Sequence, residues 1–313
     1  MRGRAAAERG DAVSAGEAKE KPASHAFRKG TDAVRQAYRH QRSEALGPRL
    51  SRRRRLAAQL APEAILTLGR DEGYAIVPPG TVPVQDLIDV AHDTLARANL
   101  AQKTEEANKP FLVKLSERHE LTLGSPLLRF GLRRDLIATA ATYLGMVPIL
   151  QYAHVLYSAH AMAEPAKSQL YHCDSDEGEQ VKVFVLCDQV TPASGPLTML
   201  SAARSQTVRD HFGYKYNQRL TDDQVYEALG SRDLVHTALV GPAGTTAFID
   251  TSRCMHYGSR FLDTTAHRLV VMLQYVTPLA FILPEEDFLS GARFRALATS
   301  GMDEVTRLVL GAQ

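Results

Sequence analysis

The sequence of 313 residues predicts a mainly β fold in which two antiparallel sheets form a roll with helices around it. Two observations support this fold class. Between about residue 146 and residue 278, short runs rich in β-branched and aromatic residues alternate with clusters of Gly, Pro, Ser and Asp, as strands and turns do. These runs follow one another without intervening helices, which favours antiparallel pairing over a parallel α/β sheet. The predicted strands cover residues 148–158, 169–174, 181–190, 197–200, 234–240, 245–250 and 268–277.

The first 55 residues are predicted to form a basic arm that is largely disordered. Residues 1–60 contain 15 Lys and Arg against 6 Asp and Glu, a charge of +9, whereas the rest of the chain contains 22 against 29. The first half of the arm has too few apolar side chains to offset the entropy lost on ordering. Helical spacing begins at Thr31 and breaks at Gly47-Pro48. Such an arm can bind nucleic acid or an anionic membrane, although a solvated extension without a partner is the expectation.

Residues 56–313 are predicted to form one domain around the roll. A long insertion at residues 207–230 interrupts the strands, and it is either a lid over the mouth of the roll or an ordinary surface excursion. The helices are predicted from apolar residues spaced three and four positions apart. The other predicted elements are a first strand at 73–78, helices at 84–100 and 135–144, the second ended by a left-handed Gly145, and C-terminal helices within 285–311.

The pair His172 and Asp174 is the most informative short pattern in the sequence. In a strand, side chains two positions apart lie on the same face, so this imidazole and carboxylate converge while Cys173 points away as a small buried filler. A second histidine would complete a set of two His and one carboxylate, which holds Fe(II) at three corners of an octahedron and leaves three positions open. His256 is the candidate. Because H-x-D recurs by chance, the prediction depends on the surrounding motifs.

Several motifs between about residue 73 and residue 278 occur in a characteristic order. They are Gly73-Tyr74-x-Ile76-Val77, Leu144-Gly145, Gln169-x-Tyr171-His172-x-Asp174, Val190-Thr191-Pro192-x-x-Gly195-Pro196-Leu197, Phe248-x-Asp250-x-x-x-x-x-His256, and Arg268 with Gln274-Tyr275-Val276-Thr277-Pro278 after it. In this order and spacing the chain resembles the phytanoyl-CoA dioxygenase family of Fe(II)- and 2-oxoglutarate-dependent oxygenases. The resemblance implies a double-stranded β-helix, the jelly roll of cupin-like proteins.

The resemblance also implies the site and its reaction. His172, Asp174 and His256 would bind Fe(II), and Arg268 would bind the distal carboxylate of 2-oxoglutarate, for which the planar guanidinium is well suited. The implied reaction is hydroxylation of a small organic substrate by O2 with release of succinate and CO2, and ascorbate can be needed in vitro. Related halogenases have a small residue where this chain has Asp174, which favours hydroxylation, although desaturation or ring formation would use the same residues.

Further residues are weaker candidates. Gln169 and Thr198 could contact the cosubstrate or metal-bound water, with packing or capping as the alternative for each, and Lys114 could reach a cosubstrate carboxylate or be solvated. The family often has a hydroxyl residue two positions after the second histidine, where this chain has Gly258, so Ser259 is the candidate replacement. The remaining histidines singled out, which are expected to be hydrogen-bonded or surface residues, are His154, His160, His211 and His236.

Composition restricts the other classes of function. No run approaches the roughly 18 apolar residues of a membrane span, and no apolar segment of signal-peptide length follows the first residues. Three widely spaced cysteines, Cys173, Cys187 and Cys254, fit neither a disulfide scaffold nor a zinc motif, so reduced thiols and a cytoplasmic location are expected. Two rivals to an oxygenase stay open. One is a roll that binds metal or ligand without redox chemistry, and the other is a scaffold tethered by the basic arm.

Overall fold

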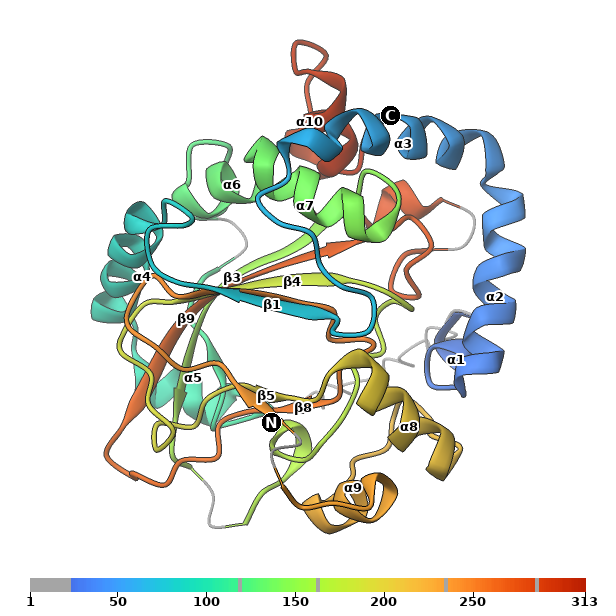
Figure 1. Cartoon of the computed structure of the whole chain (residues 1–313). Coiled ribbons are helices and arrows are strands. Elements are labelled where there is room, and N and C mark those ends of the chain that lie inside the picture. Colours follow the sequence, from blue (N-terminus) through green and yellow to red (C-terminus); the bar gives the residue numbers. More distant parts are fainter. Residues whose placement is uncertain (1–23, 118–119, 162–163, 234–235, 285–286) are drawn as a thin grey trace, which may run out of the picture.

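The roll consists of two antiparallel sheets that face each other (Figure 1). The computed structural model describes residues 24–117, 120–161, 164–233, 236–284 and 287–313. The larger sheet has six strands in the order β1-β7-β4-β9-β3-β2, and the smaller has three in the order β6-β5-β8. Every pair of neighbouring strands is antiparallel, which confirms the predicted fold class. The strands are β1 (Tyr74–Val77), β2 (Val113–Lys114), β3 (Ile149–Ala159), β4 (Val181–Leu186), β5 (Thr198–Met199), β6 (Thr237–Ala238), β7 (Thr246–Ile249), β8 (His256–Tyr257) and β9 (His267–Val276).

The two faces of the larger sheet have different neighbours. Along β9, Leu269, Val271, Leu273 and Tyr275 belong to the main apolar core, and the intervening side chains point into the roll. The same alternation occurs in β4, where Val183 and Val185 face the core. Because the side-chain period of a strand is two, each of these strands contributes to the core and to the interior of the roll at once.

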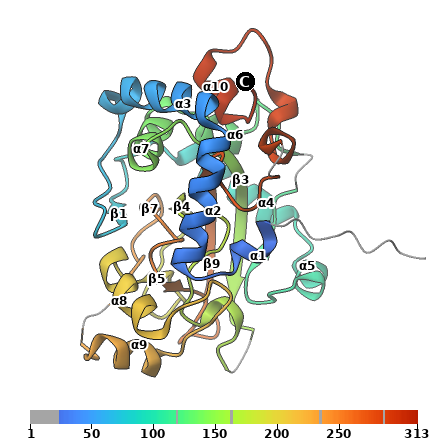
Figure 2. The same ribbon diagram turned by 90° about the vertical axis from the view of Figure 1, so that its right-hand side faces the viewer.

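Helices cover the core face of the larger sheet, and a smaller group lies beside the smaller sheet (Figures 1 and 2). The left-handed Gly145, with φ of 70°, ends α7 as predicted. Among the described residues, no helix is both long and apolar enough to cross a bilayer. The α-helices are α1 (Ser24–Arg28), α2 (Asp32–Ala45), α3 (Gly47–Leu60), α4 (Gln85–Arg97), α5 (Leu100–Glu106), α6 (Pro126–Gly131), α7 (Arg134–Leu144), α8 (Ala202–Phe212), α9 (Asp222–Leu229) and α10 (Glu304–Val309).

The helix predicted from Thr31 to Gly47-Pro48 is confirmed as α2, but the N-terminal segment is not the largely disordered arm that was predicted as far as residue 55. Residues 32–60 form α2 and α3, which lie along the roll, so the boundary predicted at residue 55 falls inside α3 (Figure 2). Three arginines of these helices, Arg35, Arg42 and Arg53, are buried. From the sequence they were expected to be solvated, whereas their guanidinium groups donate hydrogen bonds to backbone carbonyls of the domain. The disorder predicted for residues 1–23 concerns a segment outside the described residues.

Two predicted elements have a different local structure. Residues 169–174 were predicted as a strand, but a 3₁₀ turn occupies Lys167–Gln169, and only isolated bridges follow at Tyr171 and His172. The described part of residues 285–298 forms 3₁₀ turns at Phe288–Gly291 and Arg295–Leu297 instead of a longer helix. Another 3₁₀ turn, Ala61–Glu63, follows α3. Single bridges and the packing of side chains such as Tyr171 and Phe288 fix these segments, and the periodicity of the sequence predicts neither.

Candidate metal centre

A cavity of about 150 Å³ lies inside the roll between the two sheets. The larger sheet contributes side chains from β3, β4 and β9, and the smaller sheet contributes His256 of β8. Most of the wall is apolar, with Leu156, Phe184, Val270 and Met272 as examples. His172 and Asp174 also line this cavity, so the two halves of the predicted metal pattern meet in one enclosed space.

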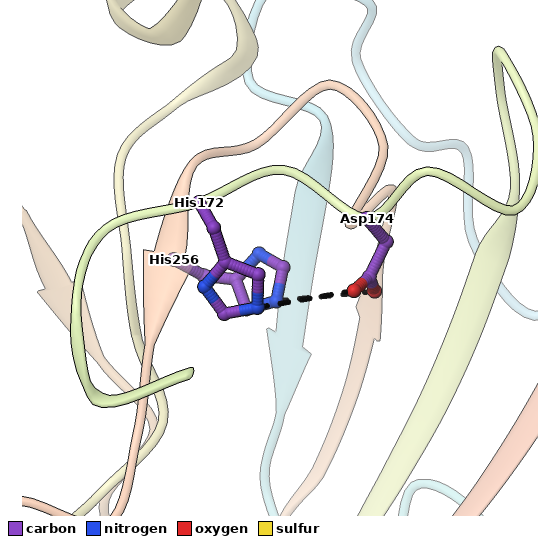
Figure 3. Close-up of side chains that lie close together, drawn as sticks. All are labelled: His172, Asp174 and His256. Carbon is purple, nitrogen blue, oxygen red and sulfur yellow. Dashed lines mark ion pairs between the residues drawn. The ribbon is translucent and has the colours of Figure 1, made fainter. Parts of the chain in front are cut away.

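The side chains of His172, Asp174 and His256 converge on one point (Figure 3). One ligand atom from each residue lies within 4.8 Å of the other two. Each histidine Nε2 is 3.9 Å from an oxygen of Asp174, Oδ1 for His172 and Oδ2 for His256. The backbones of the two histidines exchange hydrogen bonds of 3.0 and 2.9 Å across a single antiparallel bridge, and Asp174 N donates to Thr251 O at 2.8 Å. The backbone therefore fixes all three positions although only one of them lies in a strand.

The two imidazoles are oriented for metal binding. Nδ1 of His172 donates to Leu170 O at 2.9 Å, and Nδ1 of His256 donates to Cys254 O at the same distance. This pattern assigns the proton to Nδ1 and leaves the Nε2 lone pair directed at the centre. Burial lowers the pKa of both histidines, and the neighbouring imidazole lowers that of His172 further, to well below its ordinary value. Both are therefore neutral at pH 7, the form that binds a metal.

Two side chains hold the carboxylate of Asp174, one from β4 and one from the residue directly before that strand. Lys182 Nζ donates to Oδ2 at 2.6 Å, and Gln180 Nε2 lies 3.3 Å from the same oxygen. Burial acts to raise the pKa of Asp174, but Lys182 and the two histidines hold it well below the ordinary value. The carboxylate is thus ionised. Sequence analysis missed Lys182, although the alternation of the strand at 181–190 was the signal that places it on the cavity face.

Asp250 fixes the turn that leads to His256. Its Oδ2 accepts a hydrogen bond from Tyr143 Oη at 2.9 Å, and its Oδ1 accepts from the backbone N–H groups of Ser252 and Arg253. Its own N–H donates to Gly73 O at 2.8 Å. The spacing between Asp250 and His256 in the sequence motif therefore corresponds to a turn. The buried side chain of Asp250 accepts hydrogen bonds from N–H groups of this turn.

Arg268 is a buried cation in the same cavity. It is 7% exposed and lies on β9, opposite Ser158 of β3. Nη2 donates to Ser259 Oγ at 3.4 Å, and the buried Nε has no hydrogen-bond partner. No carboxylate within the described part of the chain forms an ion pair with it. Burial lowers its pKa to about 10, so the guanidinium stays charged at neutral pH.

Ser259 stands beside Arg268 where the usual hydroxyl residue is missing. Its Oγ lies 2.6 Å from Ser158 Oγ, and the backbone at Ser259 has a positive φ of 62°. A Cβ on Gly258 would make an ordinary van der Waals contact of 3.5 Å with Arg268 Nη2, so this position lies next to the guanidinium. The hydroxyl of Ser259 is thus available to the same ligand as Arg268.

The weaker candidates lie outside the cavity wall. Gln169 donates from Nε2 to Ser259 O at 2.7 Å and accepts at Oε1 from Ala166 N, so it holds the backbone of Ser259. Thr198 Oγ1 is 3.4 Å from Pro196 O, a local contact. Lys114 is exposed and lines a neighbouring hollow. Besides Lys182, the cavity is lined by Lys109, which sequence analysis did not consider because it lies in a loop without periodicity.

The insertion at residues 207–230 packs behind the metal-binding segment. Side chains of α8 and α9, including Val208 and Val225, form an apolar cluster with Tyr171, Cys173 and Met255. Within the described part of the chain, no residue of the insertion lines the cavity. The insertion therefore supports the metal-binding segment from outside in this conformation, and the predicted lid is not observed.

Comparison with known proteins identifies the fold. No family model matches the sequence, and no curated protein matches it either. EctD from S. alaskensis, solved in its apoform and with 2-oxoglutarate and 5-hydroxyectoine, aligns at a TM-score of 0.50 and 16% identity over 80% of this chain and 88% of that chain. The epimerase SnoN, solved with Fe3+, alpha ketoglutarate and nogalamycin RO, aligns at a TM-score of 0.45 and 18% identity over 72% of this chain and 85% of that chain. The likeness to EctD shows a shared jelly-roll fold, and the resemblance to the phytanoyl-CoA dioxygenase family stays a prediction.

Proposed function

We propose that the protein is a non-haem Fe(II)- and 2-oxoglutarate-dependent dioxygenase of the phytanoyl-CoA dioxygenase type. His172, Asp174 and His256 would bind the metal, and Arg268 would bind the distal carboxylate of 2-oxoglutarate. One observation carries the proposal: a convergent set of two neutral imidazoles and one carboxylate shares a cavity with a buried guanidinium that has no acidic partner among the described residues. The donor set suits Fe(II) with three open positions, and the unpaired Nε of Arg268 suits a carboxylate ligand.

The chain's own residues would prepare the reaction. Bound Fe(II) would supply the oxidising chemistry that couples O2 and 2-oxoglutarate to hydroxylation of a substrate, with succinate and CO2 as products. The carbonyls that accept from Nδ1 keep both imidazoles in the metal-binding tautomer. Lys182 leaves Oδ1 of Asp174 free for the metal by occupying Oδ2. The apolar walls exclude water from the space between the metal and the substrate.

A direct assay tests this proposal. Purified protein with Fe(II), ascorbate and 2-oxoglutarate should form succinate slowly even without substrate, and the anaerobic mixture should develop the visible absorption of an Fe(II)–2-oxoglutarate complex. Asp174→Ala should abolish both signals, whereas Asp210→Ala, at an exposed position of α8, should leave them unchanged. Succinate formation that survives Asp174→Ala would overturn the assigned site. Metal binding without any succinate would favour the rival function of a non-catalytic binding protein.

We further propose that the protein acts on small molecules in the cytoplasm. Cys173, Cys187 and Cys254 are buried free thiols, which suits a reducing compartment. Contact with nucleic acid or an anionic membrane through the N-terminal segment stays a prediction. Replacing the exposed Arg54 and Arg55 of α3 by Gln tests it, because residues 24–60 carry most of the positive charge of this segment and salt-sensitive binding through them would weaken.

A further inference from the structure

The charged groups of the cavity are unequal in sign. Three cations line it, Lys109, Lys182 and Arg268, against the single carboxylate of Asp174. Binding of Fe(II) and the dianion 2-oxoglutarate, on which this inference rests, would add equal and opposite charges. A surplus of positive charge would therefore remain beside the substrate in the loaded enzyme.

Two of the three cations have a defined partner. Lys182 donates to Asp174 Oδ2 at 2.6 Å, and Arg268 is the proposed partner of the cosubstrate. Burial lowers the pKa of Arg268 to about 10, so the guanidinium keeps its charge at neutral pH. The third cation, Lys109, has no such partner among the described residues.

Lys109 is half-buried without a partner. Its ammonium makes no hydrogen bond or ion pair with the described residues. Burial lowers its pKa, and Lys182, Arg219 and Lys167 lower it further, while Asp174 opposes them. Since Asp174 is already held by Lys182, it compensates the desolvation of Lys109 only in part. A half-buried ammonium on the cavity wall that has no partner among the described residues can donate to an acidic group of a ligand.

Lys109 lies on the border between the metal cavity and a second hollow, where an extended ligand would enter. Lys109 and Leu112 line both the metal cavity and a second hollow beside it, which α5 and β2 border. The neighbouring walls of the metal cavity are apolar, with Leu112, Leu197 and Leu239 among them. A molecule that extends from the metal to this entrance would therefore place an apolar body against leucines and its far end against an ammonium.

We infer that the substrate is an organic oxyanion with an apolar body, and that Lys109 binds its acidic group at the entrance of the cavity. A carboxylate and a phosphate monoester offer the same acceptor oxygens to Lys109. The apolar body would occupy the space between Lys109 and the metal, so oxidation would occur on a carbon remote from the acidic group. Lys109 would thus determine substrate specificity without touching the metal or 2-oxoglutarate.

The experiment uses pairs of probes that share a carbon skeleton and differ in charge. They are hexanoate with hexanamide, 3-phenylpropanoate with its amide, and hexyl phosphate with hexanol. The full-length protein is loaded anaerobically with Fe(II) and saturating 2-oxoglutarate, so that the probes do not occupy Arg268. Binding is read from the change in visible absorption of the loaded protein, and succinate formation in air provides a second readout.

The expected result is that at least one anion binds roughly 10- to 100-fold more tightly than its neutral twin, as a charge-assisted hydrogen bond predicts. Lys109→Met should remove this preference while the absorption of the loaded protein stays, which shows that the variant is folded. Lys109→Arg should keep most of it. The matched control is Lys114→Met. Lys114 is an exposed lysine that lines the second hollow but not the metal cavity, so this variant should behave as the unchanged protein.

Two outcomes would overturn the inference. Either no anion binds better than its neutral twin, or the preference persists in Lys109→Met. The carboxylate and phosphate arms show which oxyanion the site takes. If the protein develops no absorption with Fe(II) and 2-oxoglutarate and forms no succinate, the proposed function fails and this inference falls with it. If those signals are present and only the charge preference is missing, the substrate class alone is wrong.

Discussion

Two buried arginines show how the same side chain serves different purposes in this molecule. Arg53 of α3 is 1% exposed, and its guanidinium donates to Val147 O at 2.9 Å, Pro148 O at 3.3 Å and Leu308 O at 3.0 Å. Arg268 of β9 is 7% exposed, yet it donates only to Ser259 Oγ at 3.4 Å and its Nε has no partner. Burial lowers the pKa of Arg53 to about 9 and that of Arg268 to about 10, so both stay charged at neutral pH.

The two arginines differ in the acceptors of their hydrogen bonds. The carbonyls around Arg53 belong to the segment after α7 and to the last turn of α10, so this arginine fastens α3 to two other parts of the domain. The guanidinium of Arg268 faces a cavity and keeps most of its donors free. A buried cation with free donors costs stability that the folded protein alone does not recover, which a ligand can. We therefore expect Arg53 to govern stability and Arg268 to govern ligand binding.

Replacing Arg268 by Met tests the second half of this comparison and should have the largest effect. Loss of two charge-assisted hydrogen bonds of about 2 kcal/mol each should raise the half-saturating concentration of 2-oxoglutarate about 1,000-fold. The melting temperature should stay the same or rise, because an uncompensated buried charge is removed. Succinate formation across a 2-oxoglutarate titration measures the first effect and calorimetry the second. Arg268→Lys should be intermediate, since it keeps the charge and loses the planar fork.

Replacing Arg53 by Met should give the opposite pattern. The free energy of unfolding should fall by about 2 to 3 kcal/mol, because three carbonyls lose their hydrogen bonds to the guanidinium while the cost of burying a charge is also removed. Urea unfolding measures this change. Arg54→Met is the matched control, since Arg54 is exposed on the same helix and should change stability by less than about 0.5 kcal/mol. Loss of 2-oxoglutarate affinity in folded Arg53→Met would contradict the division between the two arginines.

Lys182 is a third case, a partly buried cation that is paired with a carboxylate. Lys182→Met should weaken Fe(II) binding by about 10- to 100-fold, because Asp174 loses the group that orients it and keeps it ionised. Anaerobic titration with Fe(II) checks this without a turnover assay. Lys215→Met, at an exposed lysine, should bind Fe(II) normally. An unchanged affinity in Lys182→Met would mean that Gln180 and the backbone suffice to hold Asp174.

The sequence predicted those features that local pattern determines. Alternating and helical apolar spacing located the antiparallel strands and helices such as α7 because these periods follow from backbone geometry. The two-residue period of a strand also placed His172 and Asp174 on the same face of their segment. The segment is not a regular strand, and its position depends on the bridge between His172 and His256 and on the hydrogen bond from Asp174 N to Thr251 O. The convergence of the three side chains could therefore be expected, while the contacts that produce it could not.

Buried cations were the main features that the sequence did not predict. Arg35, Arg42 and Arg53 lie in a segment whose composition is typical of a solvated arm, and their burial depends on carbonyls far away in the chain. Lys109 lies in a loop that no periodicity covers. A lysine or arginine reads as surface charge until the structure reveals its surroundings.

His154, a partly buried base on β3, gives the smallest of the expected effects. Burial lowers the pKa of His154 to about 4, and the charges of Lys114, Arg293 and Lys182 contribute to the lowering. Above about pH 6.5 the imidazole is neutral in the folded and the unfolded chain, so it adds no pH dependence. As the pH falls from there towards 4, only the unfolded chain takes up the proton, and stability is lost.

The expected loss from His154 is on the order of 1 kcal/mol between pH 6.5 and pH 5. Urea unfolding at both values measures it, and His154→Gln should reduce the difference, whereas His211→Gln, at an exposed histidine of α8, should not. The imidazole can lose its charge on burial, which the two arginines cannot do at neutral pH. A pH dependence that survives His154→Gln would therefore mean that other buried groups, with the metal-binding histidines foremost, carry the acid sensitivity of the fold.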